Sequence, residues 1–322
     1  MAEKVKKVKK TKVTKEPSLE DILWNCRDIL RSKASLATRR DIILTLVFLK
    51  FVGEKRNQQR EVISQEIRAR NEKNKGIESK RPIPEEAFLD ADFSYLKNGV
   101  FSLPAECRWE TILDTESNKL ALTLDNVVAK LDREEKSLHG ALPQKIFTDS
   151  RIEGKVLKSL IDEINKISSE KFHEKDLIGR VYEYFLQAFS INADKEEGEF
   201  YTPHSIVELI SALIEPYDGT IYDPCCGSGG MFIQAAKFVE AHGGRRENVT
   251  VFGQESQPET YRLAKMNLAV RGISYNLGEL PVSTFSNDQH KTLKADYIMA
   301  NPPFNLKNRI HAVSYTHLTL PT

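Results

Sequence analysis

The tetrapeptide Asn-Pro-Pro-Phe at Asn301–Phe304 directly follows the apolar run 295–300 and carries residue types suited to chemistry on a base. An exocyclic amine is a poor nucleophile because its lone pair is delocalised into the ring. The Asn301 side-chain oxygen and the Pro302 carbonyl can accept its two N–H groups, and the prolines hold these acceptors because their φ angles are fixed. Phe304 can stack on an extruded base, a contact worth roughly 1–3 kcal/mol. Taken alone, the same residues are also compatible with a proline turn that ends a strand.

A glycine-rich stretch, Asp-Pro-Cys-Cys-Gly-Ser-Gly-Gly at 223–230, is the second candidate for a functional segment. Glycines let a backbone approach a ligand closely and offer N–H groups at the start of the following helix. The stretch is neither the dinucleotide-binding Gly-x-Gly-x-x-Gly pattern nor a P-loop. Asp223 could accept a hydrogen bond or face a cation, and a purely structural turn is an equally good interpretation of the stretch alone.

The third candidate is Glu255, which ends the β-rich run 249–255. A carboxylate at a strand end suits the two hydroxyls of a ribose, although a single acid in this position is also compatible with a solvated loop. In open α/β sheets, ligands bind at the carboxyl ends of the strands. The three segments, each at such an end and in this order, therefore favour one shared site over three unrelated turns.

The residues after about 200 predict the elements that position this site. Apolar and β-branched runs predict strands at 219–223, 249–255 and 295–300, and helical spacing predicts helices at 204–216, 231–243 and 258–273. Strands that alternate with helices are typical of parallel βαβ units and of a doubly wound sheet.

The first half of the chain shows no strong strand pattern and predicts a helical domain. Ser18 is a suitable N-cap with Asp21 at the third helical position, and a second helix contains the apolar positions 42–51. The charged stretch 57–80 is expected to be an exposed helix end followed by a loop. Further helical periodicity runs from about 109, from 152 to 167 and from 177 to 189.

Composition limits the class of protein. A length of 322 residues suggests about two domains, and 40% hydrophobic with 29% charged residues indicates a soluble globular chain. No window approaches the roughly 18 uncharged apolar residues of a membrane span, and no signal peptide is visible. Four cysteines without a CxxC pair favour a reduced, cytoplasmic protein, and packing rather than a metal explains the adjacent Cys225 and Cys226. The Lys-rich residues 1–16 predict a disordered tail, with a non-specific phosphate contact as the alternative.

Several motifs together resemble a known family. Asp-Pro-Cys-Cys-Gly-Ser-Gly-Gly-Met-Phe, Gly-Gln-Glu and Asn-Pro-Pro-Phe-Asn resemble the motifs of S-adenosylmethionine-dependent amino-methyltransferases of DNA. Gly-Glu-Phe-Tyr-Thr-Pro at 198–203 and the N-terminal helical stretches are more closely similar to the modification subunit of type I restriction–modification systems. The resemblance covers roughly residues 18–308.

The resemblance implies an α/β fold in which an N-terminal helical domain precedes a Rossmann-like, doubly wound methyltransferase domain with an incomplete sheet. The implied activity is methyl transfer from S-adenosyl-L-methionine to the N6 amino group of adenine in double-stranded DNA. The implied catalytic residues are Asn301, Pro302, Pro303 and Phe304. The implied cofactor-binding residues are Glu199, Phe200, Tyr201, Thr202, Pro203, Asp223, Gly227, Ser228, Gly229, Gly230 and Glu255.

The family also implies partners. A specificity subunit would read the DNA target, and a second modification subunit and a restriction subunit with nuclease and translocase activity would complete the assembly. The expected organisation is a tail at 1–16, a helical domain at 17–168, a partial methyltransferase core at 169–309 and a non-native segment at 310–322.

Two features depart from the family pattern. The acid expected beside the cofactor's adenine is absent near Ser283, and Asp288 is a shifted candidate for that contact. The final residues 310–322 fit neither the family nor a strand–helix pattern and are interpreted as foreign sequence. The final residues keep open the alternative of a truncated, non-catalytic scaffold subunit. A methyltransferase that acts on an amino group of protein or RNA is a second alternative, because Asn-Pro-Pro-aromatic motifs also serve such substrates.

Overall fold

The computed structural model describes residues 17–75, 81–89, 93–96, 100–101, 103–170, 181, 184, 202 and 204–302. The expected tail at 1–16 and the expected foreign segment at 310–322 lie outside these residues. The same is true of the predicted helix 177–189, apart from Val181 and Tyr184, which pack against the helical core.

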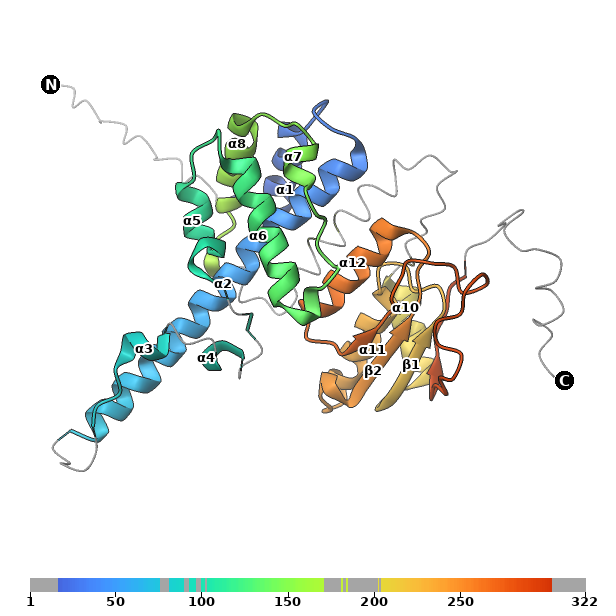
Figure 1. Cartoon of the computed structure of the whole chain (residues 1–322). Coiled ribbons are helices and arrows are strands. Elements are labelled where there is room, and N and C mark those ends of the chain that lie inside the picture. Colours follow the sequence, from blue (N-terminus) through green and yellow to red (C-terminus); the bar gives the residue numbers. More distant parts are fainter. Residues whose placement is uncertain are drawn as a thin grey trace, which may run out of the picture.

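Helices precede every strand in the described chain, as the sequence predicted. The first part contains α1 (Leu19–Ile29), α2 (Leu36–Lys73), α3 (Glu85–Leu89), α4 (Phe93–Leu96), η1 (Ala105–Cys107), α5 (Trp109–Asp114), α6 (Leu120–Glu134), η2 (Lys136–Leu138), α7 (Ile146–Asp149) and α8 (Gly154–Asn165). The second part contains α10 (His204–Ile214), β1 (Gly219–Asp223), α11 (Gly230–Ala241), η4 (Arg246–Asn248), β2 (Val249–Gly253), α12 (Pro258–Ala269), β3 (Tyr275–Asn276) and β4 (Tyr297–Ile298). Figure 1 shows the helical part beside the sheet.

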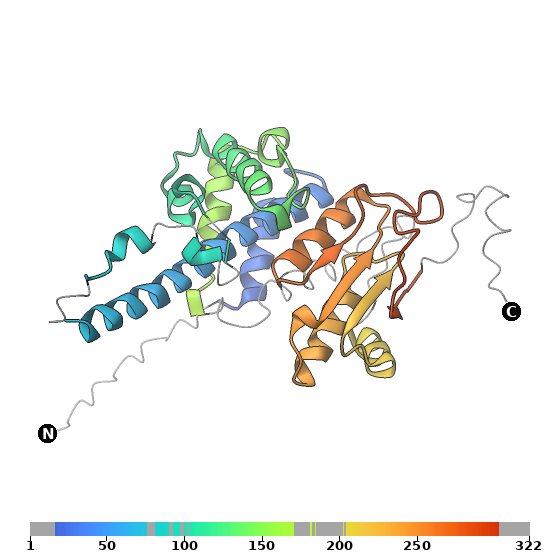
Figure 2. The same cartoon turned by 60° about the horizontal axis from the view of Figure 1, so that its bottom comes forward.

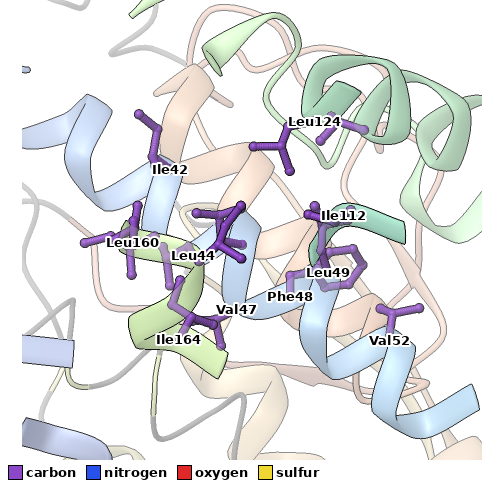
Figure 3. Packing of buried hydrophobic residues seen from close by; sticks show 14 of the residues in the cluster. Ile42, Leu44, Val47, Phe48, Leu49, Val52, Ile112, Leu124, Leu160 and Ile164 are labelled. Carbon is purple, nitrogen blue, oxygen red and sulfur yellow. The ribbon is translucent and has the colours of Figure 1, made fainter. Parts of the chain in front are cut away.

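The helical part packs around the N-terminal half of α2. Apolar side chains of this helix, including Val47 and Phe48, meet Ile112 of α5, Leu124 of α6 and Leu160 of α8 (Figure 3). All of these side chains are buried. Between Ile42 and Val52 only Thr45 and Lys50 interrupt the apolar residues of α2, so helices can pack against several sides of it. The predicted N-cap of α1 is confirmed: Ser18 and Asp21 form a capping box.

The predicted helix end in the stretch 57–80 is present and is long, because α2 continues to Lys73. The Glu, Gln, Lys and Arg residues of this stretch are good helix formers, so its charge does not end the helix. Ile63 and Ile67, one turn apart, form a small buried cluster with Leu89 and Tyr95. This half of α2 extends away from the rest of the molecule with α3 beside it (Figures 1 and 2).

The sheet is parallel with the strand order β3-β2-β1-β4. Gly219–Asp223 pairs residue by residue with Val249–Gly253, and Tyr222 stands opposite Ile298 of β4. The three predicted strands are confirmed, although β4 is shorter than expected. The sequence analysis missed β3, because a strand of two residues gives almost no alternation to detect.

The helix α12 lies between the helical part and the sheet in both views (Figures 1 and 2). Leu263 and Met266 belong to the helical core, whereas Ala264 and Leu268 belong to the core of the sheet. Beside this helix, the hydroxyl of Tyr275 donates to the carbonyl of Ser137, 2.6 Å away. The helix α12 therefore contributes side chains to the hydrophobic cores of both parts of the chain.

Candidate functional site

Asn301 and Thr202 come together at the end of β4. The Asn301 Nδ2 donates to the Thr202 Oγ1 at 2.9 Å, although 99 positions separate the two residues. Because the nitrogen end of the amide is engaged, the Asn301 Oδ1 is the end that can accept from a ligand. This contact joins the Asn-Pro-Pro-Phe motif to the Gly-Glu-Phe-Tyr-Thr-Pro motif, a pairing that the sequence analysis did not predict.

The glycine turn follows β1 directly and lies beside Asn301. The Asp223 Oδ1 accepts the backbone N–H of Cys225 at 2.9 Å, and the backbone N–H of Asn301 points to the Cys225 thiol. Gly227 and Gly229 have φ angles of 55° and 81°, in the region that favours glycine.

Open space borders two glycines of the turn, Gly227 and Gly230. A Cβ atom placed on Gly227 or Gly230 would meet no other atom within 4 Å, whereas one on Gly253 would meet Phe232 at 3.0 Å. The space beside Gly227 and Gly230 is therefore open, whereas the space beside Gly253 at the end of β2 is filled. A ligand can therefore approach the backbone of the turn without displacing a side chain.

Glu255 links the turn to the start of α12. Its Oε2 accepts the backbone N–H of Gly227 at 3.1 Å, and its Oε1 accepts that of Gln257 at 2.8 Å. Each carboxylate oxygen can accept more than one hydrogen bond, so Glu255 retains acceptor capacity for a ligand hydroxyl. The structure thus brings Asp223, Glu255 and Asn301 to the same end of the sheet, as the strand pattern predicted.

Gln254 is a residue that the sequence analysis missed. It is fully buried, and its Nε2 donates to the Asn287 carbonyl at 3.0 Å while its Oε1 accepts the Gln289 N–H at 2.9 Å. This side chain ties the loop that follows β3 to the end of β2. The Gly-Gln-Glu motif contains Gln254 and could have identified it, but the sequence analysis gave it no role.

Neither alternative for the adenine contact is decided by the geometry of this loop. The Ser283 carbonyl accepts from the Ser286 hydroxyl at 2.9 Å, and the Asp288 Oδ1 accepts the His290 N–H at 2.8 Å. Between them, the Thr284 hydroxyl donates to the Pro224 carbonyl at 2.6 Å. Thr284 therefore fastens the loop to the glycine turn, and an adenine contact by Ser283 or Asp288 stays a prediction.

Burial controls the protonation of the site. Burial first, and the negative charge of Glu255 to a smaller extent, raise the pKa of Asp223 to about 7, although the hydrogen bond from Cys225 lowers it. Burial also raises the pKa of the Cys225 thiol to about 12, so this cysteine is not a reactive thiolate. With a pKa of about 7, the Asp223 carboxyl group changes its charge near neutral pH.

The remaining candidate residues lie outside the described chain: Glu199, Phe200, Tyr201, Pro203, Pro303 and Phe304. Pro302 is described and exposed, directly after Asn301. Among the described residues, no group of three His, Cys, Asp or Glu side chains is arranged to hold a metal ion. Of the helices that the structure describes, none has both the length and the apolar character to cross a membrane.

The parallel sheet with its connecting helices is a Rossmann-like α/β domain, and it is joined to a helical domain. A family model described as N-6 DNA Methylase matches residues 173–318, and one described as HsdM N-terminal domain matches residues 19–164. The chain belongs to the family of type I restriction-enzyme methylase subunits.

Curated relatives and a solved structure agree with this family. The type I restriction enzyme MjaIX methylase subunit of Methanocaldococcus jannaschii is 32% identical over 90% of this chain and 51% of its own length. The HindI methylase subunit of Haemophilus influenzae is 37% identical over 64% of this chain and 51% of its own length. The chain spans about half the length of these relatives.

The crystal structure of a type I restriction–modification methyltransferase subunit from Streptococcus thermophilus has the same fold. It superposes with a TM-score of 0.62 at 21% identity, covering 88% of this chain and 63% of that one.

Proposed function

We propose that this chain transfers a methyl group from S-adenosyl-L-methionine to the N6 amino group of adenine in double-stranded DNA, as the modification subunit of a type I restriction–modification complex. The observation that carries the proposal is the convergence of Asp223, Glu255 and Asn301 at one end of the parallel sheet. Membership of the methylase-subunit family supports the same assignment.

The residues present fit S-adenosylmethionine. The open space at Gly227 and Gly230 admits its methionine part, and the buried Asp223 is suited to a cationic group. The remaining acceptor capacity of Glu255 suits the ribose hydroxyls. When bound, this compound supplies an electrophilic methyl group on its sulfonium.

Asn301 would orient and activate the target base. Its Nδ2 is engaged by Thr202, so its Oδ1 can accept an N–H of the adenine amine, together with the Pro302 carbonyl. Two accepted N–H bonds localise the lone pair on the nitrogen that attacks the methyl carbon. As the new N–C bond forms, the methyl–sulfur bond would break and its electron pair would stay on sulfur, leaving a neutral thioether. The extra proton of the methylated amine would pass to water, and alignment of the two reactants would supply most of the rate enhancement.

Recognition of the DNA target would come from a specificity subunit. A second modification subunit and a restriction subunit would complete the complex, in the cytoplasm. The curated relatives are type I restriction enzyme methylase subunits by name, and this supports the assembly for the present chain.

Asn301→Ala tests the catalytic assignment. We expect at least a hundredfold loss of methyl transfer to DNA in the assembled complex, on the scale seen when one transition-state hydrogen bond is removed. Binding of S-adenosylmethionine, measured by calorimetry, should persist. The matched control is Asn248→Ala, an exposed residue at the opposite end of β2, which should leave turnover unchanged.

The same assay should compare DNA, RNA and protein as acceptors of the methyl group. Radiolabelled methyl transfer to unmethylated DNA, to RNA and to protein separates the proposed activity from the alternatives. Methylation of RNA or protein alone would overturn the DNA assignment. Full turnover of DNA by Asn301→Ala would remove this residue from the catalytic site, and a complex that assembles without any transfer would favour the scaffold role.

A further inference from the structure

A buried asparagine on α12 holds the far side of the glycine turn. Asn267 is 3% exposed, and its Nδ2 donates to the Ser228 carbonyl at 2.8 Å. The guanidinium of Arg271 donates both to the Asn267 side-chain oxygen and to its backbone carbonyl. A guanidinium can only donate and a carbonyl can only accept, so these two partners fix both ends of the Asn267 amide.

Two side chains hold neighbouring residues of the glycine turn. Glu255 accepts the Gly227 N–H, and Asn267 donates to the Ser228 carbonyl. Backbone hydrogen bonds of 2.9 Å from Cys226 to Gln254 and from Gly229 to Cys226 support the same turn. Because glycines at 227 and 229 allow many backbone conformations, such contacts are needed to keep one of them.

The anchor at Asn267 rests on a rigid element. The face of α12 that carries Leu263 and Met266 is part of the helical core, and the Lys265 Nζ donates to the His139 carbonyl at 3.2 Å. The next residue, Leu268, would lie 3.7 Å from a Cβ atom on Gly229, so the turn lies against the helix. Side chains that position a ligand are most effective on such supported elements.

We propose that Asn267 is a positioning residue for S-adenosylmethionine. It holds the Ser228 carbonyl so that the backbone N–H groups of the turn keep the orientation that receives the methionine part of the cofactor. The inference rests on the proposed function. Through α12, Asn267 also ties the geometry of the turn to the helical part of the chain.

Asn267→Asp is the sharpest test, because the substitution keeps the oxygen that accepts from Arg271 and replaces only the donor to Ser228. We expect the dissociation constant and KM for S-adenosylmethionine to rise roughly tenfold, with kcat at saturating cofactor within about twofold. The matched control is Asn276→Asp, because the exposed Asn276 side chain accepts from Gly278 and can keep that role as an acid.

Thermal unfolding of each variant separates positioning from a merely structural role. A lower unfolding midpoint with an unchanged dissociation constant and KM would overturn the inference. If Asn267→Asp does not fold, Asn267→Ser removes the same contact without adding a charge, and it should also raise KM several-fold. An unchanged KM in that variant would equally overturn it.

Different results would contradict the proposed function and the positioning role of Asn267. If the unsubstituted chain does not bind S-adenosylmethionine in calorimetry, the proposed function is wrong and the inference falls with it. If the unsubstituted chain binds and both Asn267 variants bind equally well, only the positioning role is wrong.

Discussion

The helical part and the α/β part of this chain use their buried polar groups for different purposes. In the helical part, Lys50 is buried and donates to the Asn165 side-chain oxygen at 3.0 Å, and Trp109 donates to the same oxygen. These contacts lock helices to one another. In the α/β part, the buried Asp223 and Gln254 instead hold a turn and a loop beside open space.

The two faces of the sheet show a related difference. Ile221 and Val251 point into the core with α11 and α12 and are fully buried, whereas Tyr222 and Phe252 alternate with them and are only partly buried. On the second face, His290 contacts both aromatic rings edge-on, 5.8 and 5.5 Å between centroids. Most of the buried apolar side chains therefore lie in the helical core and on one face of the sheet, whereas the candidate site residues lie at the strand ends.

The largest expected effect on stability is at a side chain of the helical core. Phe48→Ala should lower the free energy of unfolding by about 3–5 kcal/mol, because the side chain is fully buried and packs beside Phe101. Ile298→Ala, on the 65% exposed side chain of β4, should change it by less than about 0.5 kcal/mol. Denaturant unfolding measures both, and equal losses would contradict this expectation.

A substitution at the strand ends should affect binding more than stability. Glu255→Ala should weaken S-adenosylmethionine binding by about 1.5–3 kcal/mol, the scale of hydrogen bonds to a charged group. Calorimetry measures the change, with the exposed Glu247→Ala on η4 as the control. An unchanged dissociation constant would remove Glu255 from the site.

The raised pKa of Asp223 predicts a cost in stability at high pH. Since its folded-state pKa of about 7 lies above the ordinary value of 3.8, the folded protein holds this proton more tightly than the unfolded chain does. The contribution of Asp223 to stability therefore falls as pH rises from about 4 to about 7 and stays low above that.

Asp223→Asn should remove this dependence. The expected gain in thermal midpoint over the unsubstituted protein is larger at pH 8 than at pH 5, while binding of the cationic cofactor becomes weaker. The exposed Asp218→Asn should change the midpoint equally at both pH values. A gain of the same size at both values would show that Asp223 is ionised across this range.

The smallest expected effect concerns the N-terminus of α1. Ser18→Ala removes a cap whose hydroxyl accepts the Asp21 N–H at 3.1 Å and should cost about 1 kcal/mol of stability. Cofactor affinity should not change, because the cap is a local contact of the helical part. Thermal unfolding with parallel calorimetry checks both statements, and a change in affinity would reveal coupling from α1 to the site.

Much of the fold was predictable from the sequence. Apolar periodicity identified the helical first half, and the alternation of strands with helices identified the parallel sheet and the end of it where the candidate site residues gather. Periodicity failed where its signal is weak: β3 has two residues, and the outer half of α2 buries one narrow side. The roles of the candidate site residues stay predictions, and six of these residues, among them Phe304, lie outside the described chain.

The sequence by itself determined which residue types stand at the strand ends: Asp223, Glu255 and Asn301. Local spacing was sufficient because each residue lies at the end of its own strand or within three residues of it. Only the tertiary structure decided that Thr202 orients Asn301 and that Asn267 anchors Ser228. Hydrogen bonds between residues far apart in the chain depend on strand order and on helix orientation, and a single polar side chain leaves no periodic pattern that could reveal its partner.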